Sequence, residues 1–530
     1  MKNKIIDFIK KKNDLIGWIL LAILFIYMNV DIYTKLDLTM ESDFSSELVL
    51  AKLLALEKKI ITTSWFYSTE LRVVNSNLVS MPLFLLTDNW HLVRILTMAI
   101  MELILFFGYY YLAKKLEIKH IPWIALMVIG ATSNEYYKYV LLCSSYIPHI
   151  VIAFVSMGLI IDIFKNKEKK NVIIKLILLL SLAYIGGLES TRLMSITYIP
   201  LVATSILYCF IKQSDNLKEG KFNFKDETIQ LIVLSILGFI FSFAGAATNA
   251  FVLPKLGYSY KLDTAIINYT DINYAQLADT LSGWLKVFGY QSQDLEVLTF
   301  WQIIIKPLFV ILFIMVVWST IDIIKHNEKY NKYEYFIALF MVVGAIILTL
   351  LFTFTTAWYR NRYLLPISVF SIFTIAIFFT HYKIEWQKWL FIILISLYVF
   401  VNTHYQINFQ IEHDGYSEFI KVKDILLENE CYNGYCDDHW NGHNLLSELS
   451  DGKIETWRIT DCDINYISEW LQSKSHLTEF PKGKTFLIVH KYNVENMGFN
   501  QDVSKYICYE DDDKLLYIFE SDEQLKSLIS

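Results

Sequence analysis

Apolar stretches of about twenty residues recur along the first 405 positions of this chain. A helix of that length matches the roughly 30 Å hydrocarbon core of a bilayer. The composition agrees, because 55% of the 530 residues are hydrophobic and only 19% are charged, which excludes an ordinary soluble protein. The sequence therefore predicts a polytopic membrane protein.

We expect about eleven membrane-spanning helices. They lie at approximately 15–33, 92–113, 121–134, 147–164, 172–188, 193–211, 229–252, 302–324, 335–357, 363–381 and 389–405. Five connections between these spans hold at least two lysines each, which indicates the cytoplasmic side. The lysine-rich connections are 114–119, 165–170, 212–225, 325–332 and 383–388. The N-terminus is also basic and no small-x-small cleavage site follows, so we expect an uncleaved cytoplasmic anchor.

An odd number of spans places the C-terminal residues 406–530 outside the cell. This tail holds 24 acidic and 11 basic residues, a net charge of −13, whereas residues 1–405 carry +7. It mixes short helical and strand-like runs such as Lys484–Val489. We therefore predict two domains, a transmembrane domain over 1–405 and a small extracytoplasmic α+β domain over 406–530.

Four of the six cysteines lie in the tail, where two disulfides could form outside the cell. These are Cys431, Cys436, Cys462 and Cys508. Cys431 and Cys436 are followed by His439 and His443, which together have the composition of a metal site. Their spacing fits no zinc finger, so a disulfide is the favoured interpretation.

Arginine is rare in this chain and unevenly placed. Only six of the 47 basic residues are arginines, and all fall in loops or helix ends predicted to lie outside. They are Arg72, Arg94, Arg192, Arg360, Arg362 and Arg458. Lysine suffices to orient a span, whereas arginine presents a rigid fork that grips a phosphate at two points. The placement indicates that something phosphorylated docks at the outer helix ends.

Two outer loops are long, 34–91 and 254–301, and the first opens with Glu41 and Asp43. In an extended segment both carboxylates would point the same way. The pair could hold Mg²⁺ or Mn²⁺ through oxygen ligands, or one carboxylate could act as a general base; the sequence fixes no cofactor. The alternative is a solvated loop that caps a helix. Ser45–Glu57 has helical apolar spacing that predicts an amphipathic surface helix, with Asp43 or Ser45 as its cap.

The same loop continues with aromatic, acidic and basic side chains at Trp65, Tyr67, Glu70 and Arg72. Such a mixture suits a sugar or acceptor site, where rings stack on the sugar and polar groups bind its hydroxyls. The alternatives are an interfacial aromatic belt for Trp65 and Tyr67 and a simple ion pair between Glu70 and Arg72.

Two further outer turns carry the remaining candidates. Gly186 and Gly187 precede Arg192, and the glycines permit close approach of the backbone. Arg360 and Arg362 stand at the mouth of an apolar span, where they are costly unless paired or solvated. A polyprenyl phosphate would meet both conditions, with its chain in lipid and its phosphate on the guanidinium groups. The alternative is lipid headgroup binding or snorkelling.

One ionisable residue, Glu102, interrupts the second span. At that depth such a group normally faces the interior of the helix bundle. We expect a structural or gating role rather than a catalytic one.

This layout resembles the GT-C class of integral-membrane glycosyltransferases, which includes protein O-mannosyltransferases, aminoarabinose transferases and oligosaccharyltransferase catalytic subunits. The shared pattern is one span, a long outer loop with an acidic motif and an amphipathic helix, many spans, and an outer soluble domain. The run from Arg362 to Pro366, Arg-Tyr-Leu-Leu-Pro, is similar to the Arg-Tyr-x-x-Pro element of several members. The acidic motif departs from the Asp-Glu pair of some members, and the tail lacks the Trp-Trp-Asp signature of oligosaccharyltransferases.

The resemblance implies a membrane all-α fold, a polytopic helical bundle of GT-C type, with a donor sugar on a polyprenyl phosphate or pyrophosphate. Asp43 is the best match to the aspartate of the class. We therefore predict an inverting, hexosyltransferase-like enzyme of a bacterial plasma membrane, in which Asp43 is the general base and Arg362, Arg360 and Arg192 bind the donor phosphate. The acceptor would be an envelope glycan, lipid or protein, and no nucleic acid is involved.

Two other functions share this pattern. A flippase or transporter of lipid-linked sugars would need polar groups along its spans and repeat symmetry, whereas the spans here are mostly apolar. A polymerase or ligase of envelope polysaccharides would use the same donor and a different acceptor.

Overall fold

The computed structural model describes residues 2–69, 71–166, 168–189, 191–218, 226–260, 268–291, 300–413 and 417–529. By their contacts these residues form two compact units. The bundle unit consists of Met1–Val30, Met98–Ala250 and Thr264–Asn408, and the mixed unit of Asp31–Thr97, Phe251–Asp263 and Phe409–Ser530. The tail from Phe409 onward therefore forms one compact unit with the whole first outer loop and a short piece of the second.

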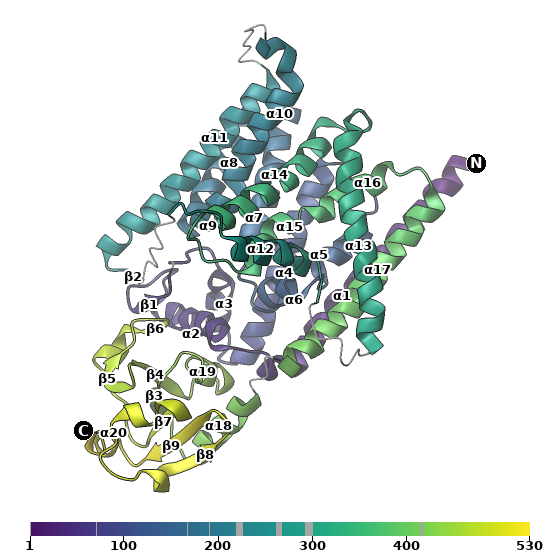
Figure 1. Ribbon diagram of the computed structural model, residues 1–530. Coiled ribbons are helices and arrows are strands. Elements are labelled where there is room, and N and C mark those ends of the chain that lie inside the picture. The colour runs from purple at the N-terminus through teal and green to yellow at the C-terminus, as the bar shows by residue number, and fades with distance from the viewer. Residues whose placement is uncertain are drawn as a thin grey trace. The chain divides into compact units, whose positions relative to one another are not determined.

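Ten helices among the described residues are long and apolar enough to cross a membrane (Figure 1). They are built on α1 (Lys2–Lys35), α4 (Trp90–Lys115), α7 (Ile147–Lys165), α8 (Lys169–Glu189), α10 (Ile199–Lys218), α11 (Glu227–Ala247), α13 (Phe300–Lys325), α14 (Lys332–Phe354), α16 (Ser371–His381) and α17 (Glu385–His413). Ten of the eleven predicted spans thus correspond to long helices.

The exception is the predicted span 121–134. Its helix α5 (Ile121–Ile129) has only nine residues, all of them buried, and it stops at Gly130. A Cβ at Gly130 would lie 2.3 Å from the Val399 side chain, so the chain passes too close to α17 at this point for any residue but glycine. A short helix α6 (Asn134–Tyr136), capped by the Ser133 hydroxyl, and a π-helix η2 (Tyr137–Leu142) follow.

Helices α8 and α11 pack side by side in the bundle unit (Figure 1). Two glycines make this possible: a Cβ at Gly187 would lie 1.9 Å from the Ser242 carbonyl oxygen, and a Cβ at Gly245 would lie 2.1 Å from that of Tyr184. Small residues let helix backbones meet in this way. The close backbone approach that the sequence predicts at Gly187 is therefore the contact between α8 and α11.

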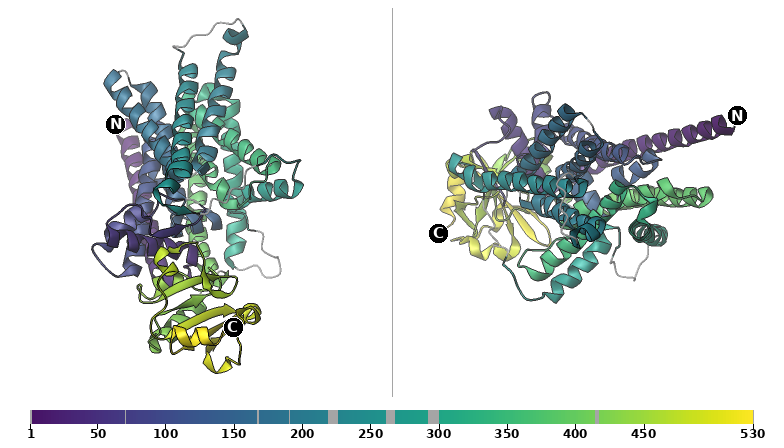
Figure 2. Two further views of the ribbon diagram at one scale, coloured as in Figure 1. Left: turned by 90° about the vertical axis from the view of Figure 1, so that its left-hand side faces the viewer. Right: turned by 90° about the horizontal axis from the view of Figure 1, so that it is seen from above.

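The core of the tail is a six-stranded sheet of order β5-β4-β3-β7-β9-β8. Figure 2 shows its strands in green to yellow. They are β3 (Asn433–Cys436), β4 (Glu455–Thr460), β5 (Asp463–Ile467), β7 (Thr485–His490), β8 (Ile507–Glu510) and β9 (Lys514–Phe519). β3 runs parallel to β4 and β7, and the other pairs are antiparallel. Helices α18 (Ser417–Glu428), α19 (Leu445–Leu449) and α20 (Asp522–Ser527) complete the predicted α+β fold.

A second, three-stranded sheet joins three distant parts of the mixed unit. Its centre is β1 (Trp65–Tyr67) from the first outer loop, which pairs in parallel with β2 (Ser259–Tyr260) and antiparallel with β6 (Gln472–Ser473). Helices α2 (Ser42–Glu57) and α3 (Asn77–Phe84) belong to the same unit. The first loop and the tail therefore share backbone hydrogen bonds.

The predicted disulfides are wrong, because all six cysteines are free thiols. Two strands, β7 and β9, separate Cys436 in β3 from Cys508 in β8. Burial raises the pKa of the Cys431 thiol to about 12 and that of Cys436 well above its usual value. These thiols are therefore protonated, inert members of the core.

Candidate functional site

Asp43 lies in the first turn of α2, which begins at Ser42 with Glu41 as its N-cap residue. A carboxylate in this turn is stabilised by the helix dipole. The helix starts earlier than predicted, so the extended conformation of this motif is wrong, and neither Asp43 nor Ser45 is the cap. Glu41 is buried, with 5% of its surface exposed, whereas 42% of the Asp43 side chain is exposed. The two carboxylates therefore differ in their access to solvent.

The structure supplies Asp43 with a partner from the tail. Nε2 of His439 lies 3.0 Å from Oδ1 of Asp43, and Nδ1 of His439 lies 3.2 Å from Nδ1 of His443. Both rings are buried. Burial lowers the pKa of His443 well below its usual value, and the nearby His439, Arg458 and His476 add to the effect. His443 is therefore neutral at physiological pH.

The first turn of α2 is fixed by a buried ion pair. Nε and Nη2 of Arg94 donate to the two carboxylate oxygens of Glu448 at 2.8 and 2.7 Å, and Nη2 also donates to the carbonyl oxygen of Phe44 at 2.9 Å. Phe44 follows Asp43 directly. This arginine thus ties the segment that carries Asp43 to α19 of the tail.

A second arginine of the first loop is also paired within the protein. Nη1 of Arg72 donates to Glu47 at 3.0 Å, and the same carboxylate accepts from Asn75 at 2.8 Å and from the Ser76 hydroxyl at 2.7 Å. Glu47 lies one helical turn after Asp43. Glu70, which we considered as the partner of Arg72, lies outside the described residues.

The aromatic residues of this loop belong to its core. Strand β1 buries Trp65 and Tyr67, which pack with Leu50, Leu54 and Leu71. The Tyr67 hydroxyl donates to the Thr62 carbonyl at 3.1 Å, and burial raises its pKa to about 12. Contact of these rings with a sugar stays a prediction.

In the bundle unit, Arg192 and Arg362 share a tyrosine ring. Arg192 stacks over Tyr363 at 5.1 Å and over Tyr146 at 5.8 Å, while Arg362 stacks over Tyr139 at 4.8 Å and over Tyr363 at 5.9 Å. We call these two arginines and three tyrosines the arginine–tyrosine cluster. Stacking uses the faces of the guanidinium groups, whereas their N–H donors lie in the plane. The structure thus brings together two of the three predicted phosphate ligands.

The segment that carries Arg362 is held by polar contacts of its own. Nδ2 of Asn361 donates to Glu135 at 3.0 Å, and the Tyr359 hydroxyl donates to Oδ1 of Asn361 at 2.9 Å. This hydroxyl packs against Gly283 of α12 (Tyr274–Val287), where a Cβ would lie 1.6 Å away. Arg360, the third predicted ligand, stacks over Trp358 at 4.0 Å.

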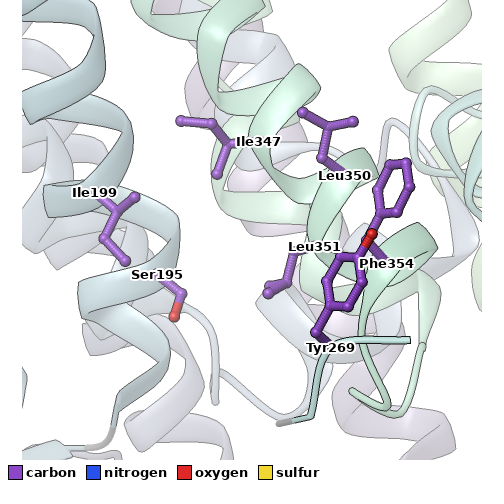
Figure 3. A pocket seen from close by; sticks show the side chains of 7 residues that line it. All are labelled: Ser195, Ile199, Tyr269, Ile347, Leu350, Leu351 and Phe354. Atoms are coloured by element: carbon purple, nitrogen blue, oxygen red, sulfur yellow. The ribbon is translucent and has the colours of Figure 1, made fainter. Parts of the chain in front are cut away.

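An apolar groove begins one helical turn beyond Arg192. Its volume is about 550 Å³, and Figure 3 shows Ser195 and Ile199 on one helix with Ile347, Leu350, Leu351 and Phe354 on the next, α14. Tyr269 also lines it and stacks on Phe354, with ring centroids 6.3 Å apart and an interplanar angle of 5°. Such a lining suits a hydrocarbon chain and not a free sugar.

Glu102 lies fully buried in the bundle unit, as predicted, and accepts a hydrogen bond from Nδ2 of Asn29 at 3.1 Å. Across the described ranges, no group of three or more His, Cys, Asp or Glu side chains is arranged to hold a metal ion. Metal binding by Glu41 and Asp43 stays a prediction, and the reaction proposed below has no step through a metal.

The arrangement of the long apolar helices and the α+β tail domain matches the GT-C fold of membrane glycosyltransferases. One similar solved structure is ArnT from Cupriavidus metallidurans bound to undecaprenyl phosphate, with a TM-score of 0.56 over 94% of this chain and 97% of that one. Sequence identity is 8%, so the likeness is one of fold. No family model and no curated protein sequence matches the chain.

Proposed function

We propose that this multi-pass membrane protein is a glycosyltransferase that moves a sugar from a polyprenyl-phosphate donor to an envelope acceptor on the outer face of a bacterial plasma membrane. The observation that carries the proposal is the arginine–tyrosine cluster beside an apolar groove, in a chain with the GT-C fold. Cationic groups next to a hydrocarbon-lined groove match an amphiphile with an anionic head. The solved ArnT structure, which holds undecaprenyl phosphate, supports the same class of ligand.

In this proposal, the polyprenyl chain and the phosphate of the donor are both bound by the bundle unit. The polyprenyl chain occupies the groove along α14, and the phosphate accepts hydrogen bonds from Arg362 and Arg192, with Arg360 nearby in sequence. Two guanidinium groups over one tyrosine ring repel each other, and an anion between them offsets that repulsion. Stacking orients the groups without neutralising their charge.

In the reaction, Asp43 removes the proton from an acceptor hydroxyl as that oxygen attacks the anomeric carbon of the sugar. The bond between the anomeric carbon and the phosphate oxygen breaks, and its electron pair leaves with the polyprenyl phosphate. Arg362 and Arg192 stabilise the charge on the leaving phosphate. A single displacement of this kind inverts the anomeric configuration.

The test replaces Asp43 by asparagine in the full chain, reconstituted in nanodiscs with an envelope fraction and a panel of undecaprenyl-phosphate hexoses. Release of undecaprenyl phosphate is followed by mass spectrometry. A general base contributes about 10²- to 10⁴-fold, so Asp43→Asn should lower the rate by that factor. Asp88→Asn is the matched control, because Asp88 is an exposed carboxylate of the same loop. Equal rates for the two variants would exclude Asp43 as the base, as a flippase predicts.

A further inference from the structure

The contact between Asp43 and His439 joins residues 396 positions apart. On the tail side, several contacts hold the histidine in place. The His439 ring is 4% exposed, so it cannot turn into solvent. An ionised carboxylate only accepts hydrogen bonds, so Nε2 of His439 donates to Oδ1 of Asp43. The opposite edge of the ring is engaged as well, because one of the two facing Nδ1 atoms of His439 and His443 donates to the other. The ring is thus held at both edges.

The backbone around His439 is constrained too. The amide of His439 donates to Oδ1 of Asp438 at 2.6 Å, and Asp437 accepts from the amide of His490 at 2.9 Å and from Nδ2 of Asn493 at 2.8 Å. Farther along the same loop, Asn444 has a φ of 57°. A non-glycine residue in this region stores strain that the surrounding structure must hold, and such strain concentrates at functional sites.

The tail also supplies a second histidine–carboxylate pair that serves for comparison. Nε2 of His476 lies 2.9 Å from Glu455, with 6% of the histidine and 53% of the glutamate side chain exposed. The geometry and burial match those of the His439–Asp43 pair. His476, however, stacks on Trp457 at 4.3 Å and its partner lies on strand β4. This pair links two parts of the tail, whereas His439 reaches across to the first loop.

We propose that His439 is a positioning residue for the catalytic base: the tail domain provides an imidazole that holds the Asp43 carboxylate in one orientation toward the acceptor hydroxyl. The inference rests on the proposed function. Rotation of a carboxylate by one rotamer moves its oxygens by more than an ångström, and a misplacement of about 1 Å costs up to about 10²-fold in rate. His443 supports the ring of His439 in the same chain of contacts. The tail is therefore part of the active site.

The experiment uses the full chain in nanodiscs and measures the rate of undecaprenyl phosphate release from the same donor panel. His439→Phe keeps the ring volume and removes the donor, and His439→Gln restores an N–H. We expect His439→Phe to lower kcat by about 10- to 10²-fold, with the KM for the lipid donor and the affinity for undecaprenyl phosphate itself unchanged. His439→Gln should recover part of the rate.

Two comparisons separate positioning from folding. His476→Phe removes a histidine of equal burial and should leave kcat within about twofold of the wild type, although it lowers the melting temperature as His439→Phe does. In the Asp43→Asn background, His439→Phe should have no further effect, because a positioning residue acts only through the group that it orients.

The outcomes are distinct. Equal kcat for His439→Phe and His476→Phe, or additive losses for the Asp43→Asn and His439→Phe pair, would overturn the positioning role while the proposed function stood. If wild type and Asp43→Asn released undecaprenyl phosphate equally slowly from every donor, the proposed function would fail and this inference with it. Partial rescue of the rate in His439→Gln, together with no further loss when His439→Phe is added to Asp43→Asn, would establish both the positioning role and the proposed function.

Discussion

Two arginines of the mixed unit and one of the bundle unit are held by different kinds of side chain. In the mixed unit, Arg94 and Arg72 each donate to a carboxylate of the same unit, so the protein itself neutralises the charge. In the bundle unit, Arg362 rests on the rings of Tyr139 and Tyr363, which attract a cation without cancelling its charge. A guanidinium paired with a carboxylate holds a fold together, whereas one stacked on aromatic rings can still bind an anion. All of these arginines lie in loops or helix ends that the sequence predicts to be outside, so the sequence alone does not separate the two kinds.

The largest effect is expected when the buried guanidinium of Arg94 is removed. Replacing Arg94 by methionine leaves Glu448 buried without its bidentate partner, which costs about 3–5 kcal/mol. The more exposed pair made by Arg72 and Glu47 is worth about 1 kcal/mol or less, so Arg72→Met should shift the melting temperature much less. Thermal unfolding of both variants in nanodiscs measures the difference. Equal shifts would contradict the structural role assigned to Arg94.

The neutral histidine of the mixed unit predicts an acid-sensitive fold. His443 has a lowered pKa in the folded chain, so below about pH 6.5 the unfolded chain binds more protons than the folded one. Stability is complete above that pH and falls by up to about 1.4 kcal/mol for each unit of decrease. Melting temperatures between pH 7.5 and 5.5 should show a steeper fall for the wild type than for His443→Phe. A slope that survives in this variant would assign the acid sensitivity to other groups.

Substitution of Arg362 tests whether an arginine stacked on tyrosine rings binds the lipid phosphate. Replacing it by lysine keeps the charge but removes the planar fork, so binding of undecaprenyl phosphate should weaken about tenfold, equivalent to about 1.4 kcal/mol. Lysine at Arg458, an arginine of the mixed unit, is the control and should leave the affinity unchanged. Titration of the lipid into protein in nanodiscs gives both constants. Unchanged affinity in Arg362→Lys would remove this residue from the phosphate site.

The smallest effect is expected in the groove. A tryptophan at Leu351 would fill part of its volume and displace the hydrocarbon chain, and losing the burial of one CH₂ group costs about 0.8 kcal/mol, or ~4-fold in affinity. Ile346→Trp on the same helix is the control, because Ile346 does not line the groove and is 53% exposed. If both variants bound undecaprenyl phosphate equally well, the chain would lie elsewhere.

The sequence predicted the parts of this fold that depend on local pattern. Ten long helices, the helix after Asp43 and the strand at Thr485–His490 all follow from the spacing and length of apolar runs. The failures come from long-range contacts. The short helix α5 stops at Gly130, which packs tightly against Val399 of α17, and apolar spacing in a window of twenty residues carries no information about that approach.

The site was predicted less completely for the same reason. Asp43 and His439 are both candidates from the sequence, but the sequence places the histidine in a metal or disulfide motif because Cys431 and Cys436 precede it. Its partner is 396 residues away. Arg94 is likewise one of the six arginines whose placement indicates a phosphorylated ligand, but its carboxylate partner is Glu448, 354 residues away. The signal in the sequence is the pair His439 and His443 in the tail, and only the fold shows what these histidines face.

The central position of β1 in the three-stranded sheet determines when this sheet can form during synthesis of the chain. Phe66 leaves the ribosome early, yet its partner Gln472 follows about 400 residues later. At roughly 5–20 residues per second, this strand waits about 20–80 s for its neighbour. During that interval its backbone N–H and C=O groups on that edge have no native partner, so a chaperone of the nascent chain has a defined window in which to act. Truncation before β6 would leave this edge open permanently and make the fragment prone to aggregation.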